Sequence, residues 1–233
     1  HIVQAFGMRN TLQPDHLTVK LQGSAGQSLG AFAAPGLKPE VSGDANAYVG
    51  KGLSGGIIVV KPLQDSPLVA HENVIIGNTV LYGATAGQLF AAGRAGERFA
   101  VRNSGASVVV EGCGSNGCEY MTGGVAVILG RIGANFGAGM TGGMAYLYDP
   151  EGAALVNMNL ETLVTCPVTV AHWEDQLKGL ITAHLHETGS RRAAAILQDW
   201  ETGRGNFLQV CPKEMLGKLA DPISIEAAAV PAE

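Results

Sequence analysis

The sequence has few cysteines, few charged side chains and no long apolar run. Its four cysteines in 233 residues are too sparse for a disulfide framework, which indicates a reducing compartment, and we expect the cytoplasm. A net charge of -5 argues against nucleic acid or an anionic membrane as a partner. No apolar run approaches the roughly 18 residues of a membrane span. The 46% of hydrophobic residues still suffices for a globular core.

The amino terminus also lacks an initiating methionine and any segment that resembles a signal peptide. The chain opens His1-Ile2-Val3 and continues directly into ordinary sequence. This beginning predicts a segment cut from a larger protein.

Glycine, by contrast, is abundant and unevenly placed. Of the 33 glycines, 27 precede Pro150 and 6 follow it. From residue 77 to residue 142 they recur at steps of nine or ten residues, and the step extends backwards across an inserted loop near residues 61–76. The chain must reverse at these corners, often at positive φ, which favours glycine. The repeat glycines are Gly26, Gly36, Gly55, Gly77, Gly87, Gly96, Gly105, Gly114, Gly123, Gly133 and Gly142.

Each repeat glycine opens a short segment that alternates like a strand. In most segments the third and fifth residues after the glycine are apolar, which predicts that they face the interior. The motif VGKGLSGG (49–56) recurs as FGAGMTGG (136–143), and the full period is 18–19 residues. Repeated turn chemistry at a fixed phase is typical of a solenoid, and parallel crossovers favour the right hand. The side chains expected inside include Phe90, Phe99, Val108, Val110, Ile128 and Phe136.

We therefore predict an all-β solenoid, a single-stranded right-handed β-helix of about six coils, followed by two to three α-helices. A stripe from Trp173 to Leu185 predicts the first helix, which ends at Gly189, while Ser190 caps the second. That helix stops at Gly203, and a short third helix is expected over 213–219. These helices are expected to cover the open end of the last coil.

Three regions follow from this division of the chain. Residues 1–20 form an amino-terminal lead-in segment, residues 21–168 the glycine-rich β-helix, and residues 169–233 a carboxy-terminal helical extension.

The pattern G-x-G-x-x-G occurs three times, beginning at Gly50, Gly112 and Gly137. A dinucleotide site requires a helix after this motif, but Gly55 and Gly142 lead into strand-like segments. Turn geometry is therefore the better interpretation, and we expect no cofactor site in this domain.

Metal and nucleophile chemistry are weakly supported. Cys113 and Cys118 have no third cysteine nearby, and a zinc or iron–sulfur site needs three or four ligands. His184 and His186 are two residues apart on a predicted helix and point to different faces. No serine, cysteine or histidine arrangement resembles a nucleophile with its base, so we expect no metal site and no catalytic residue.

A few polar residues remain as candidate contacts. Glu119 occupies a register that predicts an inward side chain, so its carboxylate needs a partner, unless the strand bulges and carries it to solvent or to an arginine. Arg98 and Arg102 lie on the outward register of the neighbouring coil, and Asn135 is also outward. These four residues form a candidate polar site.

Long motifs in the sequence resemble one known family. The segments GSAGQSLGAF (23–32), YVGKGLSGG (48–56), AGERFAVRNSGA (95–106) and NFGAGMTGGMAY (135–146) are similar to the glycine-rich (GXGXG) carboxy-terminal domain of the glutamate synthase large subunit. The chain departs from the family pattern at Ala47 and at Ser115-Asn116, positions without a catalytic duty in that family. A subunit of formylmethanofuran dehydrogenase is the second family that this domain resembles.

The resemblance implies a domain that is not an enzyme in isolation but belongs to an oxidoreductase of glutamate biosynthesis and nitrogen assimilation. The parent enzyme hydrolyses glutamine in an amidotransferase domain and passes ammonia to a synthase domain with flavin mononucleotide and an iron–sulfur cluster. There 2-oxoglutarate becomes glutamate. The implied partners of this domain are the other domains of the large subunit, and possibly the small subunit. The alternative is a domain that adds ligand contacts to the parent enzyme.

Overall fold

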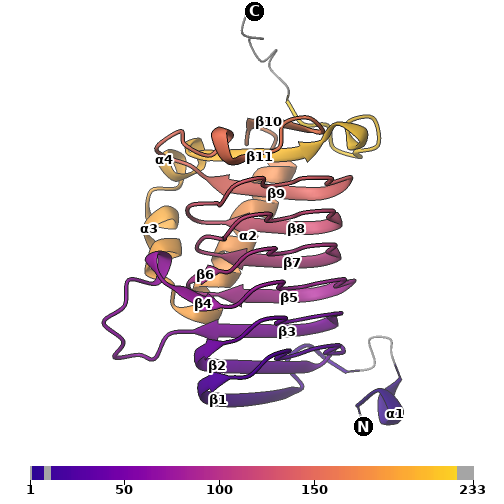
Figure 1. The fold of residues 1–233 in the computed structure, drawn as a ribbon, viewed down its shortest axis with the longest axis vertical. Helices are drawn as coiled ribbons and strands as arrows, with labels where there is room; N and C mark the ends of the chain where they lie inside the picture. Colours follow the sequence, from indigo (N-terminus) through magenta and orange to yellow (C-terminus); the bar gives the residue numbers. More distant parts are fainter. Residues whose placement is uncertain (1, 8–11, 225–233) are drawn as a thin grey trace, which may run out of the picture.

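A computed structural model describes residues 2–7 and 12–224 and shows a stack of parallel strands (Figure 1). Seven strands, one for each turn, each pair in parallel with the next one. The predicted β-helix is confirmed, with about seven turns where six were expected. The strands are β1 (Leu17–Ala25), β2 (Leu37–Ala45), β3 (Ser54–Lys61), β5 (Ala86–Ala91), β7 (Ser104–Val110), β8 (Thr122–Ile128) and β9 (Gly142–Tyr148).

An excursion interrupts the stack after β3. The chain leaves at Lys61, forms the 3-10 turn η1 (Ala70–Glu72) and returns as β4 (Val74–Ile76). In the returned strand, Ile76 pairs with Ala45 of β2, and β4 also pairs with β6 (Arg94–Ala95). A short helix, α1 (Ile2–Phe6), precedes the first turn.

The central strands are apolar on both faces, as parallel strands with two covered faces usually are. In β7, Val108 and Val110 belong to the core inside the solenoid, whereas Val109 belongs to a second core outside it. Phe99 and Phe136 lie inside, as predicted, but Phe90 belongs to the outer core, so its predicted orientation is wrong. Leu89, not Phe90, pairs with Val108, and this one-residue shift places Phe90 on the other face.

Five repeat glycines lie in two columns in which successive turns approach closely, whereas Gly36, Gly55 and Gly87 have the positive φ that a chain reversal was expected to need. A Cβ on Gly105, Gly123 or Gly142 would meet a backbone carbonyl of the preceding turn. Gly77 and Gly133 lie in the opposite column, where a Cβ would also meet the backbone of the turn before. None of these five glycines has positive φ, so close approach explains them better than the expected chain reversal.

Within residues 12–224, three α-helices follow the solenoid: α2 (Ala171–Thr188), α3 (Arg191–Gln198) and α4 (Trp200–Gly205). The single second helix predicted to stop at Gly203 is wrong, because Asp199 leaves the helical conformation and its side chain caps α4. As predicted, Gly189 ends α2 in a left-handed conformation, and the Ser190 hydroxyl caps α3 by accepting the Ala193 N–H. Leu177 and Ile181 of α2 pack in the outer core with Phe90, so the helices lie against the solenoid's own side. No helix in the part of the chain that the structure describes is long and apolar enough to cross a membrane.

The last turn is covered by strands, contrary to the prediction that helices cover it. β11 (Phe207–Pro212) pairs antiparallel with β9, and β10 (Leu163–Pro167) pairs antiparallel with β11 (Figure 1). The helix expected over 213–219 is instead a single 3-10 turn, η3 (Lys213–Met215), and a similar turn, η2 (Leu155–Asn157), follows β9. Pairing with β11 gives the backbone N–H and C=O groups at the edge of β9 hydrogen-bond partners, which a helix packed through its side chains could not provide.

Candidate functional site

One corner of the solenoid has an unusual backbone that repeats in six successive turns. In each turn, the first, third and fifth residues of a five-residue segment have left-handed φ between 53° and 74°, and the residues between them do not. We call these six segments the left-handed ladder. They are residues 28–32, 48–52, 79–83, 98–102, 116–120 and 135–139.

Backbone hydrogen bonds join the turns of the ladder. In the segment 98–102, the N–H groups of Arg98 and Arg102 donate to the following turn at 2.8 and 3.0 Å. The N–H of Ala100 donates to Val80 of the preceding turn at 2.9 Å. Because the donors point alternately up and down the stack, the ladder is held on both sides and forms a rigid frame.

The ladder directs its side chains in a regular way. The third residue of a segment points inward, and Leu81, Ala100 and Cys118 at this position are fully buried. The first and fifth residues face outward. Left-handed backbone costs a side-chain-bearing residue about 1 kcal/mol relative to glycine, yet twelve of the eighteen left-handed positions carry side chains. The ladder therefore carries side chains at positions where glycine would cost less conformational free energy.

Aromatic rings pack directly against two glycines of the ladder. Carbon atoms of the Phe32 ring lie 2.5 Å from where a Cβ on Gly52 would be, and the Tyr120 ring lies equally close to the Cβ position of Gly139. The second glycine of the G-x-G-x-x-G motifs at 50 and 137 therefore provides space for a ring from the preceding turn. The third glycine, Gly55 or Gly142, lies in a strand, as the sequence predicts.

The outward face carries exposed aromatic rings beside cationic groups. Phe32 is 66% exposed and Tyr120 is 51% exposed, and Tyr48 and Tyr82 are also exposed. Arg102 follows the same outward column as Phe32 and Tyr120. Tyrosine, phenylalanine and arginine are enriched in protein interfaces, so this composition favours a contact surface.

The four candidate polar residues all lie on the ladder, but they do not converge into one site. Arg98 Nε donates to Glu119 Oε2 at 3.0 Å. Asn135 donates to the Asn116 amide at 2.9 Å and accepts from Asn159 at 3.2 Å. In both interactions, the side-chain groups that could bind a ligand are already hydrogen-bonded to a neighbouring residue. Arg102 is exposed and lies in the other outward column.

The inward register predicted for Glu119 is wrong. It is the fourth residue of its ladder segment, and its carboxylate is 17% exposed and paired with Arg98. Among the equivalent residues, Tyr82 is exposed and Val101 is buried, so this position of the ladder has no fixed burial. The alternation of a strand does not apply here because the segment is a left-handed ladder, and the pairing with an arginine agrees with the second interpretation of this residue.

The structure also contains a buried polar cluster beneath the helices, which the sequence analysis did not predict. The Ser190 hydroxyl donates to Glu111 Oε1, and His184 Nε2 lies 3.6 Å from the same oxygen. Glu111 is 1% exposed and His184 is fully buried. The Ser190 oxygen also accepts the Ala193 N–H, and the residue is buried away from any substrate. This cluster therefore joins α2 and α3 to β7 and does not present a nucleophile.

The four cysteines are free and buried. Burial raises the pKa of the Cys113 thiol to about 12 and that of Cys118 well above its usual value. Across residues 2–7 and 12–224, no group of three or more cysteine, histidine or acidic side chains could hold a metal ion. The described cysteines therefore do not supply the three or four grouped ligands that the iron–sulfur cluster of the parent enzyme would need.

Comparisons with known proteins point to one family. The family model described as "GXGXG motif" matches residues 1–213. The chain is 63% identical over 227 residues to the glutamate synthase [NADPH] large chain of Azospirillum brasilense, covering 97% of this chain and 15% of that protein. It is 52% identical over 197 residues to ferredoxin-dependent glutamate synthase 2 of Synechocystis, covering 84% of this chain and 13% of the relative. The chain thus spans about one seventh of these relatives.

Proposed function

Because this chain belongs to the GXGXG-motif family and matches a segment of glutamate synthases, we propose that it is a structural and interaction domain without its own active site. It supports the amidotransferase and flavin synthase domains of a parent enzyme that makes glutamate from glutamine and 2-oxoglutarate. Flavin mononucleotide and the iron–sulfur cluster bind to those other domains. Its partners are the remainder of the large subunit and, through it, the small subunit.

The outward face of the left-handed ladder is the observation that carries this proposal. Exposed rings of Phe32, Tyr48, Tyr82 and Tyr120 lie on a frame whose backbone is hydrogen-bonded in both directions. A rigid frame loses little conformational entropy when it docks, which favours its use as a support. Relatives six to seven times longer than this chain supply the domains that such a face would contact.

The first test uses the purified 233-residue chain. We expect it to show no glutaminase activity and no oxidation of a nicotinamide, because no described residue forms an activated nucleophile. Titration with flavin mononucleotide, glutamine and 2-oxoglutarate tests the alternative that the domain contributes ligand contacts. Glutaminase turnover that disappears on mutation of a residue in the chain, or saturable binding that an Arg102→Gln change abolishes, would contradict the structural role.

The second test uses a full-length glutamate synthase that contains this segment. Replacing Phe32 and Tyr120 with serine removes apolar area from the proposed contact, and we expect faster proteolysis between domains and a lower rate of glutamine-dependent glutamate formation. Val156→Ser is the matched control, because Val156 is 88% exposed and lies outside the ladder. Equal behaviour of the double variant and the control would refute docking through this face.

A further inference from the structure

A second feature of the molecule is a cavity of about 720 Å³ at the junction of the insert, the solenoid and the helices. Its walls come from η1, β6, the turn after β8, the segment after β9 and α3. Small-molecule sites typically have volumes of roughly 300–1,000 Å³. The cavity is separate from the left-handed ladder, since the two share no residue.

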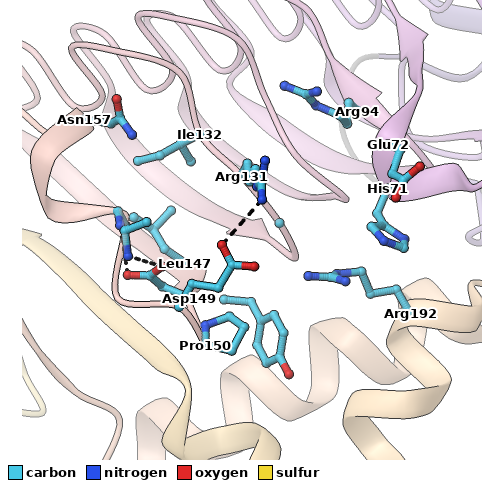
Figure 2. Close-up of a pocket in the computed structure, with 15 residues that line it drawn as sticks. His71, Glu72, Arg94, Arg131, Ile132, Leu147, Asp149, Pro150, Asn157 and Arg192 are labelled. Carbon is cyan, nitrogen blue, oxygen red and sulfur yellow. Dashed lines mark hydrogen bonds and ion pairs between the residues drawn. The ribbon is translucent and has the colours of Figure 1, made fainter.

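Three arginines and a histidine from four different segments line this cavity. Arg94 belongs to β6, Arg131 follows β8, Arg192 lies on α3 and His71 lies on η1. Figure 2 shows these side chains around the hollow, with Arg192 reaching toward it from its helix. Positive groups gathered from such distant parts of the sequence favour a shared negative partner.

Arg94 has an unsatisfied donor. Its Nε is buried and makes no hydrogen bond to any described residue. A buried donor without a partner costs free energy, and most such groups in folded proteins are satisfied. The buried Nε itself is out of reach of a ligand, but the terminal nitrogens of the same guanidinium are not buried, and no hydrogen bond joins them to a described residue, so they remain open to an acceptor in the cavity.

Arg192 is held in position with part of its guanidinium free. Its Nε donates to the Leu129 carbonyl, and its guanidinium carbon lies 5.2 Å from the centre of the Tyr148 ring. Among the residues described, none accepts a hydrogen bond from its terminal nitrogens. The two fixed contacts orient the free edge and lower the entropy cost of binding.

Three carboxylates also line the cavity, but none of them forms an ion pair with these two arginines. Both oxygens of Asp149 accept backbone N–H groups, from Ala153 and Ala154, at 2.9 Å. Glu151 pairs with Arg131 at 3.5 Å. The remaining acid, Glu72, is exposed, and no ion pair to Arg94 or Arg192 occurs within the described residues.

We propose that this cavity binds a small polyvalent oxyanion, carrying phosphate or carboxylate groups, between Arg94 and Arg192, with His71 and Arg131 beside it. A guanidinium presents two parallel N–H donors that match both kinds of oxyanion. Because the walls come from three parts of the fold, the ligand also ties the insert and α3 to the solenoid. This site goes beyond the support role, which does not depend on it.

The test is a calorimetric titration and a thermal-shift series on the 233-residue chain with pyrophosphate and with citrate, each compared with sodium chloride at equal ionic strength. We expect saturable binding of at least one of the two anions and a rise in Tm that follows its concentration. Binding of only one anion identifies phosphate or carboxylate as the preferred group. No saturable binding of either anion would overturn the proposal.

Variants localise the binding. Arg94→Gln removes a guanidinium from the wall of the cavity and should weaken binding of the anion at least tenfold. Arg131→Gln, at a side chain that is 83% exposed, should weaken binding severalfold without affecting folding. Arg98→Gln is the matched control, since it removes the same charge from the left-handed ladder. Unchanged affinity in both cavity variants, or an equal loss in the control, would show that the anion does not bind in this cavity.

Discussion

Replacing Gly77 with alanine tests whether the repeat glycines serve close packing between turns. An alanine Cβ at this position would lie 2.6 Å from the Ala47 nitrogen and 2.8 Å from the Asn46 carbonyl carbon. The φ of Gly77 is not positive, so the substitution adds no backbone strain. Its effect therefore comes from overlap with the neighbouring turn alone.

The overlap sets the expected magnitude. To reach the 3.4 Å of ordinary contact, the two turns must separate by about 0.8 Å, and both contacts are backbone atoms that cannot rotate away. Overpacking of this kind costs about 1–3 kcal/mol. In a chain of this size such a loss lowers Tm by roughly 2–12 °C, which circular dichroism on heating measures.

Gly179→Ala provides a control of opposite sign. Gly179 lies within α2 with no atom near its Cβ position, so alanine should stabilise the chain by about 0.5–1 kcal/mol through helix propensity. A Gly77→Ala variant that is as stable as the wild type, or that gains stability like Gly179→Ala, would refute close packing as the reason for the glycine repeat.

Three further predictions follow from the packing and the electrostatics. Phe99→Ala should destabilise the chain by about 3–5 kcal/mol in chemical denaturation, because the ring is fully buried inside the solenoid; an unchanged midpoint would contradict its placement. Truncation near Val168 removes both the helices and β11, so we expect aggregation by light scattering, whereas a monodisperse product would show that β9 needs no cover. The Trp200 indole and Arg204 lower the pKa of Glu174, so its stabilisation is present above the usual carboxyl range and is lost as the pH falls through the lowered pKa. Glu174→Gln should therefore reduce Tm at pH 7 and converge with the wild type in acid, and a difference that persists in acid would argue against the ion pair.

The sequence predicted the helical extension well where the signals are local. The stripe around Trp173, the left-handed Gly189 and the Ser190 cap depend on residues within a few positions of one another. Such signals need no knowledge of the rest of the fold. The candidate polar residues were not placed as well, because the strand register put Glu119 inward and the other three outward, and no sequence pattern showed that Arg98 pairs with Glu119 in the next turn.

The left-handed ladder could not be predicted because alternating φ leaves no compositional trace. Half of the nine-residue segments are strands, and the others are ladder segments with the same spacing of apolar residues. Glycine occupies only six of the eighteen left-handed positions, and arginine, tyrosine and asparagine occupy others. The strand period therefore described Val108 correctly and Glu119 incorrectly.

By itself, the sequence determined that the chain is a solenoid, because a repeat of 18–19 residues fixes how often the backbone returns to the same place. Only the tertiary structure decided what covers the last strand, which face holds Phe90 and which arginines meet in the cavity. Those outcomes depend on the length of the insert after β3 and on β11, which returns from beyond the helices to pair with β9. Contacts between parts so distant in the chain are set by packing and backbone pairing across the whole fold, and no local pattern records them.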